Sequence, residues 1–100
     1  AQHSNGAMPT TAPEYVIFEG PGMDVFAESP EWGGSLVIFP FMYYETYGDD
    51  SLIKKYYPNM RRYVDYLKTR ADKGILSFGL GDWYDYGDFR AGFSRNTPVP

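Results

Sequence analysis

A single stripe of apolar residues in the middle of the chain constrains the fold most. Its members recur at intervals of three and four residues, the spacing of one face of an α-helix: Leu52, Tyr56, Met60, Tyr63, Val64 and Leu67. The opposite face carries charged side chains, as on a solvated helix: Lys54, Lys55, Arg61, Arg62, Asp65 and Lys68. The pattern predicts a helix over residues 50–72 that ends by Gly74, with a kink or a restart at Pro58.

A second helix is predicted just before the first, over residues 30–47. Pro30 suits the first helical position, Ser29 can cap the first turn, and Glu31 suits the positive end of the helix dipole. The stretch after it is apolar nearly all round, which predicts burial on most faces and a kink at Pro40. Three tyrosines of this stretch are therefore expected in the core: Tyr43, Tyr44 and Tyr47.

The joint between the two helices is short. Gly48 suits the position after a helix end, and Asp49 or Asp50 can cap the helix that follows. Two or three connecting residues predict an antiparallel helical hairpin. Residues 1–28 and 75–100 are broken by Gly and Pro and predict long ordered loops, with Tyr15–Phe18 an extended loop rather than a strand. The expected fold is all-α, with strand content below about a fifth.

Composition narrows the function. One hundred residues make one domain, and a net charge of −4 disfavours a nucleic-acid surface. No apolar run is long enough to cross a membrane, so neither nucleic acid nor membrane is expected as a partner. The chain has no cysteine, and His3 is its only histidine, expected to be exposed. A thiolate zinc site, a Cys nucleophile and a His-based triad are therefore excluded within this chain, and no metal or cofactor is expected.

The densest chemistry lies in residues 79–88, where three aspartates alternate with Trp83 and two tyrosines between glycines. Aromatic rings stack on the apolar side of a sugar and carboxylates accept bonds from its hydroxyls, so the stretch suits a glycosidase or a sugar-binding site. The structural alternative is a glycine-rich turn with local aspartate hydrogen bonds and Trp83 in the core. A calcium loop lacks its closing Glu here, and Gly79-Leu80-Gly81 is no dinucleotide fingerprint because no third Gly opens a helix.

Ordered motifs along the whole chain resemble those of bacterial α-L-rhamnosidases. In chain order, the matching residues are Gln2 with Asn5-Gly6-Ala7-Met8-Pro9, Pro30-Glu31-Trp32-Gly33, Pro40, Tyr43, Tyr47-Gly48-Asp49, Tyr57, Met60, Tyr66-Leu67, Gly81-Asp82-Trp83 and Asn96-Thr97-Pro98. Asn5 stands where the family has an acid before the glycine, and a tract over residues 14–28 has no family counterpart.

The resemblance implies a helical-hairpin segment of an (α/α)6 barrel, built from six helical hairpins. It implies a hydrolase that removes terminal α-L-rhamnosyl residues with inversion, from a rhamnose-containing glycoside or polysaccharide. The family's catalytic acid and base lie in motifs that do not occur in residues 1–100. We therefore expect no catalytic residue here, and expect residues 1–100 to be a partial catalytic domain, a fragment of a longer chain that works in the periplasm or outside the cell.

The resemblance also implies site residues. Trp32 and Trp83 match tryptophans that wall the rhamnose site, and Asp82 is expected to bind a sugar hydroxyl or to support residues that do. Two other classes stay open: a non-catalytic carbohydrate-binding helical module, which the aromatic and acidic content also suits, and a helical segment without a ligand.

Overall fold

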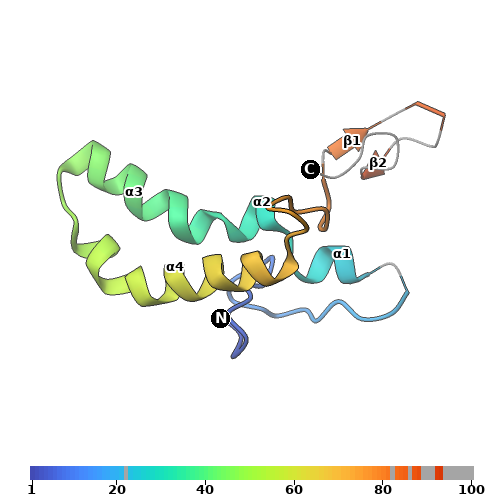
Figure 1. The fold of residues 1–100 in the computed structure, drawn as a ribbon, viewed down its shortest axis with the longest axis horizontal. Coiled ribbons are helices and arrows are strands. Elements are labelled where there is room, and N and C mark those ends of the chain that lie inside the picture. The colour runs from blue at the N-terminus through green and yellow to red at the C-terminus, as the bar shows by residue number, and fades with distance from the viewer. Residues whose placement is uncertain (22, 82, 86, 89–91, 94–100) are drawn as a thin grey trace.

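The computed structural model describes residues 1–21, 23–81, 83–85, 87, 88, 92 and 93. Two long helices dominate it, α3 (Ser35–Tyr47) and α4 (Ser51–Arg70). They lie side by side in opposite directions, and the rest of the described chain gathers around one end of the pair (Figure 1). The chain is all-α in class, as predicted, and no helix among its described residues is long and apolar enough to cross a membrane.

The joint between α3 and α4 has the predicted chemistry. Gly48 adopts φ +68°, in the left-handed region that favours glycine, and its N–H donates to the Tyr44 carbonyl at 2.7 Å. The Asp49 carboxylate accepts from the Ser51 N–H at 2.9 Å, which lowers the pKa of Asp49. The hairpin is thus set by local hydrogen bonds at the turn.

The predicted helix over residues 30–47 is divided at Gly34 into α2 (Pro30–Gly33) and α3. Pro30 opens α2 as predicted, but Ser29 makes no side-chain capping bond to it. The Ser29 hydroxyl instead bonds to two groups outside the helix backbone, which are described below. Pro40 lies inside α3 and Pro58 inside α4, and α4 does not restart there.

The small core forms on α4 where the N-terminal segment crosses it. Tyr63 and Tyr66 are buried there with Ala7, and Met60 is buried nearby. The predicted stripe is right for Met60 and Tyr63, but Tyr56 and Val64 are 37% and 38% exposed. Tyr66, which lies outside the stripe, is buried because the chain before α2 covers that side of α4.

Hydrogen bonds attach the N-terminal segment to α4. The Gln2 amide donates to the Asn59 carbonyl and accepts from the Asn59 side chain, both at 2.9 Å. Arg62 donates to the Ser4 carbonyl at 2.9 Å. The Asn5 side chain accepts from the Ala7 N–H at 3.0 Å, a role that an aspartate at the same position could also fill.

Helix α3 departs most from expectation. Among the described residues of α3, Pro40 alone is buried, and the predicted core tyrosines Tyr43, Tyr44 and Tyr47 are exposed. The prediction was wrong because an all-apolar helix needs neighbours on several sides, and within the described chain α3 packs chiefly on α4.

The segments outside the hairpin are mostly irregular. Residues 14–19 carry no strand, as predicted, and α1 (Asp24–Ala27) is a single turn. Helix α4 ends at Arg70, before a turn at Lys73 and Gly74. The C-terminal part is not wholly a loop: β1 (Trp83–Asp85) pairs antiparallel with β2 (Gly92–Phe93), with a register irregularity between their two pairs.

Candidate functional site

The start of α2 is bonded to a glycine-rich turn fifty residues further along the chain. The Leu80 N–H donates to the Ser29 hydroxyl oxygen at 3.1 Å, and the Gly81 N–H donates to Glu31 Oε1 at 3.0 Å. The Ser29 hydroxyl in turn donates to Glu31 Oε2. Ser29 is 1% exposed, so its hydroxyl is a buried polar group with both its donor and an acceptor position in use. We call these contacts of Ser29 and Glu31 with residues 79–81 the α2 latch.

Gly79 permits the close approach of the two segments. Its φ is +103°, and a Cβ placed there would lie 2.8 Å from Pro30 Cδ and 2.8 Å from Ser29 Oγ. Both distances are shorter than real Cβ contacts, and the Pro30 ring cannot move aside as a flexible side chain would. The turn therefore requires glycine here for its conformation and for space.

A second set of polar contacts attaches the chain just before α2 to the end of α4. The Tyr66 hydroxyl donates to Glu28 Oε2 at 2.7 Å, and Arg70 Nη1 lies 3.1 Å from Glu28 Oε1 and 2.7 Å from the Tyr66 hydroxyl oxygen. The Arg70 guanidinium also lies over the Phe78 ring, 4.1 Å from its centre. Both strands that meet at the latch are thus bonded to α4.

The buried phenols beside the latch are perturbed. Burial, with added repulsion from Glu28, Tyr66 and Glu31, raises the pKa of Tyr63 to about 12. Burial also raises the pKa of Tyr66, and its hydrogen bond to Glu28 adds to the effect. Both phenols are therefore neutral hydrogen-bonding groups near neutral pH. The Tyr63 hydroxyl lies against Gly33, at a point where a Cβ would collide with it.

The predicted site residues lie next to the latch in sequence, and the structure places them to different degrees. Trp32 follows Glu31 in α2 and is 53% exposed. Trp83 begins β1, two residues after Gly81, and the structure describes its backbone only. Asp82 lies outside the described residues. The latch thus joins the segments that carry the two tryptophans.

The latch itself was not predicted from the sequence. Ser29 and Glu31 were read as a helix start, and no spacing rule links them to residues 79–81. The available signal was weak: two glycines around Leu80 leave backbone N–H groups that need acceptors once buried.

The other candidates do not form a second site. His3 is exposed, as predicted, and pairs with Glu14 at 3.1 Å. Within the described part of the chain, no group of three or more His, Asp or Glu residues is arranged to hold a metal ion. Asp85 lies in β1, and Asp88 is exposed.

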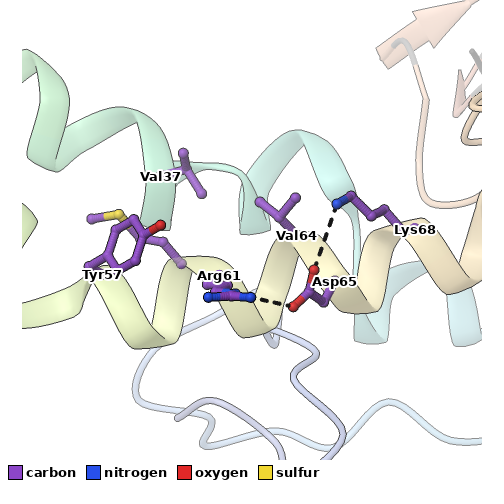
Figure 2. Close-up of a pocket in the computed structure, with 7 residues that line it drawn as sticks. Val37, Tyr57, Arg61, Val64, Asp65 and Lys68 are labelled. Carbon is purple, nitrogen blue, oxygen red and sulfur yellow. Dashed lines mark ion pairs between the residues drawn. The ribbon is translucent and has the colours of Figure 1, made fainter.

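A groove of about 350 Å³ lies between α3 and α4. Figure 2 shows Val37 of α3 facing Tyr57 and Val64 of α4, with Asp65 between Arg61 and Lys68 at 3.9 and 3.8 Å. None of the latch residues or predicted site residues lines this groove. It is an apolar gap in the hairpin with a charged rim, apart from the candidate site.

Comparison with known proteins gives a consistent answer. Residues 1–100 match the family described as the bacterial alpha-L-rhamnosidase 6 hairpin glycosidase domain. The chain is 37% identical over 54 residues to an alpha-L-rhamnosidase of Formosa agariphila, covering 53% of this chain and 6% of the relative. It is 32% identical over 56 residues to an alpha-L-rhamnosidase of an Alteromonas species, covering 55% and 6%.

The chain spans about 6% of the length of these curated relatives, and no solved structure matches it. The family match nevertheless covers every residue, and the helical hairpin of α3 and α4 is the kind of unit from which a six-hairpin domain is built. This chain therefore belongs to the bacterial alpha-L-rhamnosidase six-hairpin glycosidase family.

Proposed function

We propose that residues 1–100 are a segment of an inverting glycoside hydrolase that cleaves terminal α-L-rhamnosyl residues from a rhamnose-containing glycoside or polysaccharide. The family match supports the hydrolase class, and the printed names of both relatives supply the sugar. In this proposal the segment supplies aromatic walls of the sugar pocket, and the catalytic acid and base come from outside these residues.

The observation that carries the proposal is the α2 latch. It joins the turn before Trp83 to the residue before Trp32 through two hydrogen bonds from Leu80 and Gly81. Trp32 is large and half exposed, although an indole ring favours burial, so it is available to a ligand. Two aromatic segments brought together beside Asp82 suit a sugar with an apolar face.

The chemistry of L-rhamnose fits such a wall. Its C5 methyl group and ring C–H bonds make one side of the sugar apolar, and that side packs on aromatic rings. Inversion requires a carboxylic acid and a carboxylate about 6.5–9.5 Å apart, with room for the attacking water. Because Glu31 already accepts hydrogen bonds from this chain at both its oxygens, we assign it to neither role.

We also propose that residues 1–100 are one part of a larger (α/α)6 domain. The supporting observation is the surface of α3, where Phe39 and Phe41 are 64% and 53% exposed. A helix that is apolar all round is stable in a fold only when other elements cover it. Further hairpins of a six-hairpin domain would cover it.

The test replaces Trp83 by Ala in the longer enzyme that we propose contains this chain. Loss of one aromatic wall removes about 1–3 kcal/mol of sugar contact, so kcat/KM for a chromogenic α-L-rhamnoside should fall about 5- to 150-fold. Trp83→Phe keeps an aromatic face and should fall less. Tyr15→Ala, which removes an exposed aromatic ring from an N-terminal loop, is the matched control.

Three results would contradict the proposal. The first is a large fall in melting temperature of Trp83→Ala with kcat/KM per folded molecule unchanged, which would make Trp83 a core residue. The second is turnover by the 100-residue chain alone that is lost in Asp85→Asn, which would place the catalytic acids here. The third is rhamnoside binding without any turnover by the longer protein, which would favour a non-catalytic carbohydrate-binding module.

A further inference from the structure

We infer that Glu31, acting with Ser29, is a positioning residue that holds the turn at residues 79–81 and so sets where the Trp83 segment enters the sugar site. The inference rests on the proposed function, because it concerns how the proposed wall is built. Neither residue is assigned contact with the sugar.

The argument starts from the two oxygens of Glu31. Oε1 accepts from the Gly81 N–H at 3.0 Å and Oε2 accepts from the Ser29 hydroxyl. A surface carboxylate needs no such partners, since water serves it well, yet Glu31 uses both oxygens on its own chain. A bond from a backbone N–H to a carboxylate is stronger than one between neutral groups. This arrangement fixes a loop backbone rather than presenting an acid to a substrate.

Ser29 completes the arrangement from the buried side. Its hydroxyl accepts from the Leu80 N–H at 3.1 Å, and Leu80 is itself buried. Two successive backbone N–H groups of the turn therefore end on two side chains of one short segment. Two adjacent bonds restrict rotation of the turn as well as its distance from α2, which a single bond would not do.

The segment that bears the latch is itself held. Glu28, directly before Ser29, is bonded to Tyr66 and Arg70 of α4, and the Arg70 guanidinium lies over Phe78 on the other side of the junction. The turn is thus held against the buried face of α4 rather than against a free loop. Support of this kind keeps side chains of a binding site within narrow limits of position.

The test uses two unrelated ways of opening the latch in the longer enzyme. Glu31→Ala removes the acceptor of the Gly81 N–H, and Gly79→Ala forces the turn away from Pro30 by collision. Glu31→Gln keeps an acceptor oxygen and should restore most of the lost function. Gly74→Ala is the matched control, because Gly74 also has a positive φ, +82°, but nothing lies within 4 Å of its Cβ position.

We expect Glu31→Ala and Gly79→Ala to raise KM for an α-L-rhamnoside, and Kd for free L-rhamnose, by about 3- to 30-fold with kcat little changed. Amide hydrogen exchange at Leu80 and Gly81 should accelerate in Glu31→Ala, while exchange in α4 stays slow. Gly74→Ala should show neither effect. A role confined to stability would lower the melting temperature and leave KM and Kd per folded molecule unchanged.

The result that overturns the inference is unchanged KM and Kd in both latch variants of an active enzyme, or a Glu31→Gln variant as impaired as Glu31→Ala. Failure of the proposed function is recognised separately, on the unmodified enzyme. If that enzyme neither binds L-rhamnose nor turns over the rhamnoside, the proposed function is wrong before any variant is made.

Discussion

Helices α3 and α4 are the two arms of one hairpin, yet they meet their surroundings differently. Helix α4 has one charged face and one apolar face, and its apolar face is partly covered by the N-terminal segment and by α3. Helix α3 has no polar face, and Phe39 and Phe41 stand in the open. The difference indicates that α4 has found its partners within these residues, whereas α3 still requires them.

The largest expected effect would break this comparison on the α3 side. A Phe39→Asp/Phe41→Asp double variant should change the unfolding free energy of the 100-residue chain by only about 0.5 kcal/mol per site, because both rings are exposed there. In the longer enzyme the same charges would be buried without partners, at a cost of several kcal/mol, on the order of 3–5. The measurement is soluble yield and urea denaturation of both proteins.

The matched control for that experiment is Lys55→Asp on the charged face of α4. Lys55 is exposed, so we expect a change within about 0.5 kcal/mol in both proteins. If the longer enzyme tolerates the α3 double variant as well as Lys55→Asp, α3 has no covering neighbours and the proposed six-hairpin context of this segment is wrong.

A second, intermediate effect would sharpen the comparison on the α4 side. Gly6 packs against α4 with φ +97°, and a Cβ there would lie 2.6 Å from the Arg62 carbonyl oxygen. Gly6→Ala should cost about 1–3 kcal/mol for backbone strain and about 1–3 kcal/mol for overpacking. Gly48→Ala, at the end of α3, meets nothing within 4 Å and should cost only the strain, about 1–2 kcal/mol. Equal losses in denaturant unfolding would mean that the N-terminal segment does not pack closely on α4.

The smallest expected effect comes from the buried phenol of α4. The pKa of Tyr63 is raised from 10.0 to about 12, chiefly by burial, so the folded state keeps its proton where the unfolded state has lost it. The stability that this proton contributes is complete below pH 10 and is lost as the pH rises through about 12. Tyr63→Phe should therefore lose less stability than the unmodified chain between these pH values.

The check is denaturant unfolding at pH 9 and at stepped higher pH, with phenolate absorbance recorded in parallel. Some dependence should remain in Tyr63→Phe, because the pKa of Tyr66 is raised as well. Identical alkaline loss of stability in the two proteins would show that Tyr63 is not buried beside Glu28 and Glu31.

The sequence by itself determined the elements that depend on near neighbours in the chain. The apolar repeat predicted α4, Pro30 marked the start of α2, and Gly48 closed α3 as predicted. Each of these follows from helix period, proline geometry or left-handed glycine, which act over a few residues. The ordered family motifs likewise indicated the family that the comparison confirms.

Tertiary structure alone decided which surfaces these elements bury. Tyr66 is covered and Val64 is not, because the side of α4 that is buried depends on where residues 1–28 cross it. The pairing of Ser29 and Glu31 with Leu80 and Gly81 likewise joins groups some fifty residues apart. Helical period reports which residues share a face, but it carries no information on what packs against that face, since long-range contacts depend on the path of the whole chain.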